Sequence, residues 1–489
     1  MKKIINTIKE KDNIIIFILF FFVSLGICLN LSIEASDEIW NFQNVYKMYN
    51  GFKIYEEINV IITPFFFWCA KIIFHILGAN LCVFRVCHSV LMAVLSLFTY
   101  KILKKLDIPK KISLLTVSMI IVQQFFLFVR TSFNYNSMAL LFFIIGVYYL
   151  INEKTRKNIY IQAFITLLII GTKQNIGVYY LIGNIVYFIF SQVSIRNKIK
   201  KSLKYLGSIF LGSIAFIIYL LLDNNLYNFF NYTLGGILEF ANENLNIEIT
   251  SIIYMISITL INIGISAYII KKNYFSEKQK ENIKILFIFS IMLCLTSYPI
   301  FNWGHIIIGT YLMIINVVYI VYTLLKDFED FIQKIVKYVN IVLTLVMIIF
   351  STSNMYLWIK MITSDNYPYL WEEPFFGGNI AEEEYQKNNH VKKYIEENEK
   401  NVIVLSNKAA LYMIPLKRNN GDFDLPFKGN LGIKGEDGLI EKVNNMVNTQ
   451  FLIVKDKNQK NYQESIKVDE YIKNTKKYTG EIEGFEIYE

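Results

Sequence analysis

The sequence predicts a membrane protein built mainly of helices, with a small α/β domain at its C-terminal end. Three observations predict this fold class. The chain of 489 residues is 54% hydrophobic, more than soluble domains usually are. Its apolar residues gather in repeated runs of about 18–22 residues, the length that crosses the hydrocarbon core of a bilayer. Residues 360–489 are hydrophilic instead. Long runs and only 7 prolines favour helices over a β-barrel, whose strands read as roughly ten-residue alternating segments.

The first apolar run, 13–33, follows a lysine-rich start. It lacks a small-residue cleavage pattern, so it predicts an uncleaved membrane helix with its N-terminus in the cytoplasm. Residues 37–50 then carry apolar side chains at helical spacing, which predicts a helix lying in the membrane interface. A second juxtamembrane helix is predicted from Pro64 to Gly78, because proline suits the first turn of a helix.

Further apolar segments then alternate across the membrane, which makes about eleven spanning helices in all. The inferred cytoplasmic loops are basic and the outer loops are poor in Lys and Arg, as the positive-inside rule requires. These loops also explain the net charge of +9, which therefore indicates topology and not a nucleic-acid partner. The segments after the first are 83–103, 113–129, 137–151, 160–171, 176–190, 206–222, 252–270, 285–297, 306–325 and 339–358.

With this topology, residues 1–359 form a transmembrane domain and residues 360–489 form an extracytoplasmic α/β domain. None of the five cysteines lies in the second domain, and none has the spacing of a zinc site. The stretch 418–438 is rich in Gly, Asp and Asn and is predicted to be a loop. The predicted elements of this domain are helices at 388–399 and 408–414 and strands at 401–405, 451–454 and 484–488, with 462–476 of mixed character.

Two adjacent carboxylates, Asp37 and Glu38, lie just past the first predicted membrane helix. One interpretation is structural, because Asp37 suits the N-cap of the interfacial helix. The other is catalytic: Asp37 accepts the proton of an acceptor hydroxyl that attacks the anomeric carbon of a sugar. Neighbouring aromatic side chains raise the basicity of a carboxylate, as this role needs. Asp37 and Glu38 are therefore candidate catalytic residues.

Two cations, Arg85 and Lys173, are predicted at the outer ends of spanning helices. An ionisable group at membrane depth costs about 2.5–3.5 kcal/mol on insertion scales unless it pairs or reaches the surface. Anchoring at the lipid headgroups is one explanation of both cations. The other is contact with the phosphate of a polyprenyl-phosphate sugar, where positive charge stabilises the departing phosphate.

Polar side chains in two outer loops are candidates for a substrate pocket. Asn134 and Asn136 close one loop, and Tyr298 and His305 belong to another. A lone histidine there fits a hydrogen-bonding role better than a metal ligand, and the use of a divalent metal stays open. The chain has no Walker loop, GxGxxG, HExxH or kinase motif, which argues against a nucleotide-sugar donor on the cytoplasmic side.

Taken in order, three motifs resemble those of the GT-C membrane glycosyltransferases, in particular the protein O-mannosyltransferases and the lipid A aminoarabinose transferases. The resemblance covers residues 1–205 by motif and the rest by layout. Thr63 stands where the aminoarabinose transferases have a lysine, and their acidic loop residue is absent from the stretch that begins at Asn134. The motifs are Asp37-Glu38, then Pro64 with Gly78-Ala79-Asn80 and Arg85, then Thr172-Lys173.

The resemblance implies a GT-C-type bundle of about 11 transmembrane helices with two juxtamembrane helices in the first outer loop. It also implies an inverting transfer from a polyprenyl-phosphate sugar to a hydroxyl of a cell-envelope glycan, lipid or protein. The expected place is the outer face of a bacterial plasma membrane, with Asp37 as the base. The alternatives are a transporter or flippase of lipid-linked sugars, and a non-catalytic protein whose tail binds a cell-surface polymer. The absence of internal repeats argues against a transporter.

Overall fold

A computed structural model describes every residue except 1, 34–36, 125–132, 152–157, 192, 244–247, 272–274, 365–372, 427–428 and 456–464. The packing of the backbone divides the chain into two compact units, each made of three segments. The helical unit comprises Met1–Cys28, Val86–Phe216 and Leu245–Leu357. The mixed unit comprises Leu29–Arg85, Ile217–Asn244 and Trp358–Glu489.

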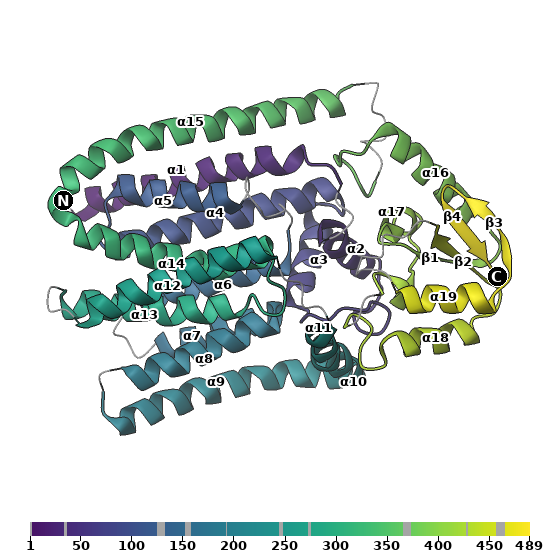
Figure 1. Cartoon of the computed structure of the whole chain (residues 1–489), viewed down its shortest axis with the longest axis horizontal. Helices are drawn as coiled ribbons and strands as arrows, with labels where there is room; N and C mark the ends of the chain where they lie inside the picture. Colours follow the sequence, from purple (N-terminus) through teal and green to yellow (C-terminus); the bar gives the residue numbers. More distant parts are fainter. Residues whose placement is uncertain are drawn as a thin grey trace. The chain divides into compact units, whose positions relative to one another are not determined.

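The helical unit is a bundle of long helices that run alongside one another (Figure 1). Each predicted spanning segment overlaps one helix, and residues 125–129 of the segment 113–129 lie outside the described residues. The helices that correspond to these segments are α1 (Lys2–Leu29), α4 (Leu81–Lys105), α5 (Lys110–Val122), α6 (Tyr135–Leu150), α7 (Asn158–Thr172), α8 (Gln174–Phe190), α9 (Ile195–Leu222), α12 (Ile249–Lys271), α13 (Glu277–Leu295), α14 (Trp303–Leu324) and α15 (Glu329–Ile362).

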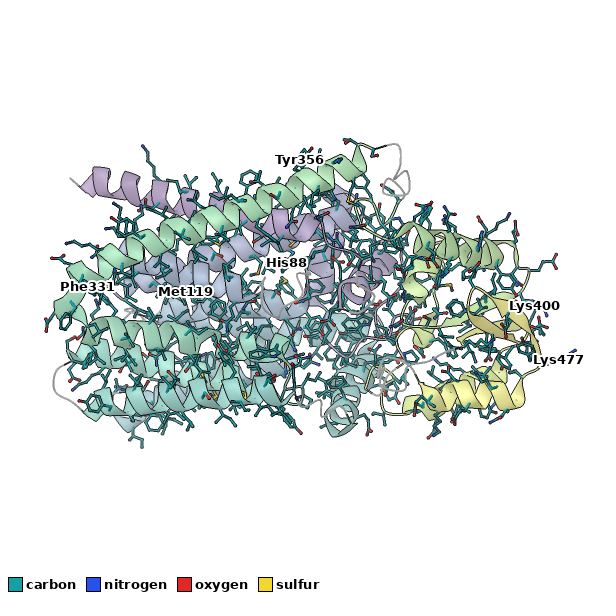
Figure 2. The ribbon with its side chains drawn as sticks, turned by 45° about the horizontal axis from the view of Figure 1, so that its top comes forward. His88, Met119, Phe331, Tyr356, Lys400 and Lys477 are labelled. Atoms are coloured by element: carbon teal, nitrogen blue, oxygen red, sulfur yellow. The ribbon has the colours of Figure 1, made fainter. Side chains whose placement is uncertain are left out.

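Among the described residues, six helices are long and apolar enough to cross a membrane. They make the protein a multi-pass membrane protein, while the count of about eleven spans stays a prediction. The surface of the bundle is also apolar in places. Phe331 and Tyr356, near the two ends of α15, are 64% and 65% exposed, and their side chains are labelled in Figure 2. A helix that exposes large apolar side chains along its length suits contact with lipid.

Inside the bundle, buried amides link three helices. Asn316 on α14 donates to Asn262 of α12 at 2.8 Å and to Ser266 at 3.0 Å. Asn262 in turn donates to Ser290 of α13 at 3.0 Å. Hydrogen bonds of this kind hold membrane helices together where no hydrophobic effect drives their association.

Helices α1 and α15 approach each other closely at Gly26. A Cβ atom at this glycine would lie 2.4 Å from the carbonyl oxygen of Ser351. The Ser351 hydroxyl donates to the Val23 carbonyl at 3.1 Å. Two small residues therefore let the backbones meet, as small residues commonly do at helix interfaces in membranes.

We expect Gly26→Leu to destabilise the protein, because the larger side chain forces α1 and α15 apart. Overpacking of this kind costs about 1–3 kcal/mol. Thermal unfolding of the detergent-solubilised protein measures the effect. Gly264→Leu is the control, since a Cβ atom at Gly264 meets nothing within 4 Å. Equal unfolding temperatures for the two variants would contradict the proposed contact.

The mixed unit contains both helices predicted in the first outer loop. They are α2 (Asp37–Tyr49) and α3 (Phe65–Leu77). Pro64 precedes α3, and Gly78 ends it with a φ of +101°, a conformation that glycine adopts at no steric cost. Between the predicted spanning segments 206–222 and 252–270, the described residues form α10 (Leu226–Phe230), a π-helical turn (Asn231–Gly236) and α11 (Ile237–Glu243).

The C-terminal part of the mixed unit is an α/β domain. Its strands are β1 (Asn401–Leu405), β2 (Thr449–Val454), β3 (Tyr478–Ile482) and β4 (Phe485–Tyr488). In the described residues they form one sheet in the order β1-β2-β4-β3. β1 and β2 are parallel, and β4 is antiparallel to both β2 and β3.

Helices cover both faces of this sheet (Figure 1). α16 (Glu382–Glu397) and α17 (Ala409–Met413) pack on one face through Val391, Ile395 and Tyr412. α18 (Gly435–Asn445) and α19 (Ile466–Thr475) pack on the other. The prediction of a loop over 418–438 is wrong at its end, because α18 begins at Gly435. Its two glycines indicated a turn, but Leu439 and Val443 form a buried face that stabilises the helix.

Within the mixed unit, polar contacts join the segment that contains α2 and α3 to the α/β domain and to the residues before α10. Lys47 of α2 forms an ion pair with Asp424, and each side chain is only 3% exposed. Burial lowers the pKa of Lys47 to about 7, and the neighbouring carboxylate opposes that shift because it favours the ammonium form. Asn59 donates to the Asp424 carbonyl at 3.0 Å. Asn225, before α10, donates to the Ile54 carbonyl at 2.7 Å.

Candidate active site

The two predicted catalytic carboxylates lie side by side in the chain but in different surroundings. Asp37 is exposed at the first residue of α2, whereas Glu38 is buried. The Asn41 side chain donates to the Asp37 carbonyl at 2.7 Å, which fixes the backbone of the first turn. A negative charge is favourable at this end of a helix because of the helix dipole. Asp37 is therefore an exposed residue at a fixed backbone position.

Glu38 is held by Arg85 in a paired, two-point contact. Nε of Arg85 donates to one carboxylate oxygen at 2.9 Å, and Nη2 donates to the other at 2.8 Å. The Arg85 side chain is 1% exposed and that of Glu38 is 4% exposed. Such a bidentate arrangement is among the stronger hydrogen-bonded ion pairs in proteins.

The rest of the Arg85 guanidinium binds backbone carbonyls at the end of α1. Nη1 donates to Leu29 at 3.2 Å and to Leu31 at 2.9 Å. Nη2 also donates to Ser32 at 3.3 Å. Together with the two bonds to Glu38, these contacts use the five N–H groups that an arginine has. The geometry thus favours a positioning role for Arg85 over the predicted contact with a donor phosphate.

Aromatic rings support α2 from the side of the buried Glu38. Phe42 packs against Phe74 of α3 and Phe84 of α4, with ring centroids 5.7 and 5.6 Å away. It also contacts Phe375, whose ring centroid is 5.7 Å away. The helix that begins with Asp37 is therefore fixed by apolar packing as well as by the Glu38–Arg85 pair.

In the helical unit, two other predicted site residues come together. Lys173 lies between α7 and α8, and its ammonium donates to the Asn136 side chain. It also lies 5.4 Å from the centre of the Tyr135 ring. Tyr135, Asn136 and Lys173 are thus one cluster, which we call the Lys173 cluster. His305, in the first turn of α14, is bonded through its ring Nδ1 to the Asn302 side chain at 2.9 Å.

The remaining predicted pocket residues have other surroundings. Asn134 caps α6, because its side chain accepts a hydrogen bond from the Ser137 N–H at 2.9 Å. Tyr298 follows α13, is 51% exposed and packs its ring near Phe301. Neither assignment to a pocket is tested by these contacts. An asparagine just before the first residues of a predicted helix is an N-cap signal that the sequence already contains.

Sequence reasoning missed two features. It gave no partner for Glu38, because the partner lies 47 residues away in the chain. It also passed over the buried Lys47, although a cation among apolar residues of a helix was a usable signal. As for metals, no group of three or more His, Cys, Asp or Glu side chains that could hold an ion is found in the described part of the chain.

Comparisons with known proteins show which families this chain resembles. Residues 62–221 match the model of the dolichyl-phosphate-mannose-protein mannosyltransferase family. The crystal structure of ArnT from Cupriavidus metallidurans in the apo state is similar over 98% of each chain, with a TM-score of 0.55 and 9% sequence identity. No curated protein sequence matches the chain. The match and the shared fold confirm the predicted resemblance of this chain to the GT-C membrane glycosyltransferases.

Proposed function

We propose that the protein is a membrane glycosyltransferase that moves a sugar from a polyprenyl-phosphate donor to a hydroxyl acceptor on the extracytoplasmic face. The observation that carries the proposal is the exposed Asp37 at the start of α2, a helix that the buried ion pair between Glu38 and Arg85 holds in place. The fold and the mannosyltransferase match support it. Neither finding favours the alternative of a transporter of lipid-linked sugars.

In this mechanism Asp37 acts as a general base. It accepts the proton of the acceptor hydroxyl as that oxygen attacks the anomeric carbon of the donor sugar. A new carbon–oxygen bond forms, and the bond between the anomeric carbon and the phosphate oxygen breaks on the opposite side. Polyprenyl phosphate leaves with the bonding electrons, and the configuration at the anomeric carbon is inverted.

The Lys173 cluster is the better candidate for the donor phosphate. The five N–H groups of Arg85 already have acceptors. Lys173 lies at the start of α8, beside the amide of Asn136. An ammonium group at the start of a helix, where backbone N–H groups also point outward, suits a phosphate oxygen. The charge that develops on the departing phosphate is stabilised by such donors.

The direct test measures which donor the purified full-length protein uses in liposomes. We expect sugar transfer and release of polyprenyl phosphate with a polyprenyl-phosphate sugar, and no transfer with the matching nucleotide sugar. Transfer from the nucleotide sugar at a similar rate would overturn the proposal. So would movement of the lipid-linked sugar across the bilayer without any cleavage of its phosphate bond.

We expect Lys173→Gln to lower kcat/KM for the donor by about 10- to 100-fold, the effect of losing one charge-assisted hydrogen bond. Initial rates at varied donor concentration measure it. Lys105→Gln is the matched control, because Lys105 is also half-buried and lies over a tyrosine ring. Lys105 is the last residue of α4, at the end that is predicted to lie on the cytoplasmic side. An unchanged kcat/KM in the Lys173 variant would show that the donor phosphate does not bind at this cluster.

A further inference from the structure

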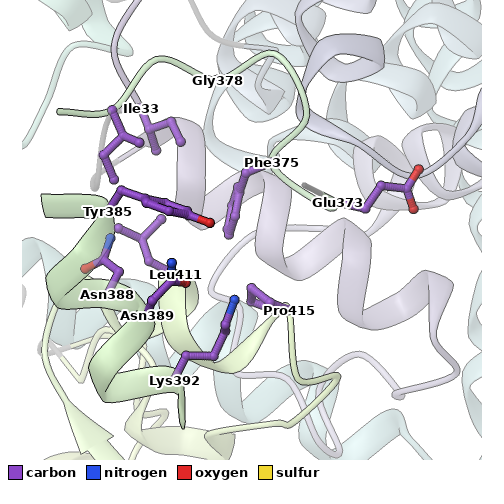
Figure 3. Close-up of a pocket in the computed structure, with 11 residues that line it drawn as sticks. Ile33, Glu373, Phe375, Gly378, Tyr385, Asn388, Asn389, Lys392, Leu411 and Pro415 are labelled. Atoms are coloured by element: carbon purple, nitrogen blue, oxygen red, sulfur yellow. The ribbon is translucent and has the colours of Figure 1, made fainter. Parts of the chain in front are cut away.

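A pocket in the mixed unit is not used by the proposed reaction. We call it the α16 pocket, because α16 forms one of its walls (Figure 3). It has about 500 Å³ of empty space, which includes open solvent. Its lining combines aromatic rings, amides and charges. The residues on which the argument depends are Ile33, Phe375, Tyr385, Asn388, Asn389 and Lys392.

Four of these residues form a single stripe of α16. Tyr385, Asn388, Asn389 and Lys392 follow one another at helical spacing and so share one side of the helix. An adjacent stripe contains Val391, which is packed into the core of the sheet. The helix therefore packs its apolar stripe into the core of the sheet, and the aromatic and amide stripe beside it lines the pocket.

The chemistry of the lining suits a sugar. In Figure 3 the rings of Phe375 and Tyr385 and the polar ends of Asn389 and Lys392 point toward one space. Aromatic faces pack against the C–H faces of sugar rings, as they do against other apolar groups. An amide both donates and accepts, and an ammonium donates, so these groups match the hydroxyls of a sugar.

The wall of the pocket is joined by hydrogen bonds to Arg85, the residue that holds Glu38 next to Asp37. The Ile33 N–H donates to the Asn379 carbonyl at 2.8 Å, and Ser32 pairs with Asn379 in a short β-bridge. The carbonyl of Ser32 also accepts a hydrogen bond from Arg85. Ile33 precedes Asp37 by four residues, which span at most about 14 Å of chain. A short oligosaccharide bridges such a distance.

We propose that the α16 pocket binds a sugar residue of the acceptor, so that the acceptor is a glycan chain. This inference rests on the proposed function, since it names the acceptor of that reaction. A sugar held in the pocket places a neighbouring sugar of the same chain near Asp37, where its hydroxyl is deprotonated. The pocket sets which acceptor is used and takes no part in the bond-breaking step.

The test uses the full-length protein with a radiolabelled polyprenyl-phosphate sugar and oligosaccharides released from the cell envelope of the producing organism. The variants are Tyr385→Leu and Asn389→Ala, singly and together. The control is Lys387→Ala on the opposite side of α16, where Lys387 pairs with the exposed Glu383. Thermal unfolding confirms that each variant is folded.

We expect label in the glycan fraction, and we expect the double variant to need at least about tenfold more oligosaccharide for half-maximal transfer. Its hydrolysis of the donor by water and its kcat should equal those of the wild type. Label in a protease-sensitive or lipid fraction would overturn the inference, and so would wild-type acceptor dependence in the double variant.

If the proposed function itself fails, the result differs from a failure of the pocket inference, because the wild type then neither transfers nor hydrolyses the donor sugar. In that case equilibrium dialysis with the same labelled oligosaccharides still tests the pocket. Retention by the wild type and by Lys387→Ala, but not by the double variant, supports sugar binding. Equal retention by all of them, or by none, overturns it.

Discussion

Asp37→Asn is expected to abolish sugar transfer while the protein stays folded and inserted in the membrane. The amide has nearly the shape of the carboxylate but cannot accept the proton of the acceptor hydroxyl. A general base contributes about 10²- to 10⁴-fold to a rate, and the variant should lose activity by that factor. Folding should be unaffected, because Asp37 is exposed and asparagine serves about as well as aspartate at the start of a helix.

The measurement is the initial rate of sugar transfer at saturating donor and acceptor. Glu382→Gln is the matched control, since Glu382 is an exposed acid in the first turn of α16. A wild-type rate for Asp37→Asn would show that Asp37 only caps its helix. The general base would then be a different residue.

Arg85→Met is expected to cause the largest loss of stability among single substitutions in the mixed unit. It removes one partner of a buried ion pair, and such changes cost about 3–5 kcal/mol because the remaining charge has no partner. Here Glu38 is left buried, and three carbonyls at the end of α1 also lose their donor. Unfolding by heat or denaturant in detergent measures the loss.

A double-mutant cycle separates the two roles considered for Arg85. In the positioning role, Glu38→Gln combined with Arg85→Gln restores part of the stability that either change alone removes, because no unpaired charge remains. In the phosphate-binding role, the Arg85 variants stay stable and show only a raised KM for the donor. Lys53→Met is a control that should leave stability unchanged, since Lys53 and Glu56 form an exposed pair.

Much of the fold was predictable because its signals are local. Long apolar runs predict membrane helices, and β1, β2 and β4 are short apolar segments flanked by polar residues. β3 was missed because it is an edge strand whose residues 478–482 are largely exposed. A strand with no buried face has no alternation to detect. α18 was missed because its glycines resemble a turn, and only packing against the sheet makes it a helix.

The candidate site was predictable only in part, for a related reason. The Asp37-Glu38 pair and the cations could be selected, since charged side chains near apolar runs need an explanation. The pairing of these charges with one another could not be predicted. Glu38 and Arg85 meet because α2 and α4 pack together, and three acceptors of Arg85 are backbone carbonyls that any residue type supplies. The α16 pocket likewise exists only once Ile33 and α16 are brought together.

The buried pair between Lys47 and Asp424 has a consequence for how the protein is made. Its two residues are 377 positions apart, so α2 leaves the ribosome long before its partner is synthesised. Until Asp424 arrives, the Lys47 ammonium has no carboxylate to compensate its burial, which costs several kcal/mol. We therefore expect α2, the helix that begins with Asp37, to be fixed only late in synthesis. Under the proposed function, a chain cut short before residue 424 is expected to lack transferase activity.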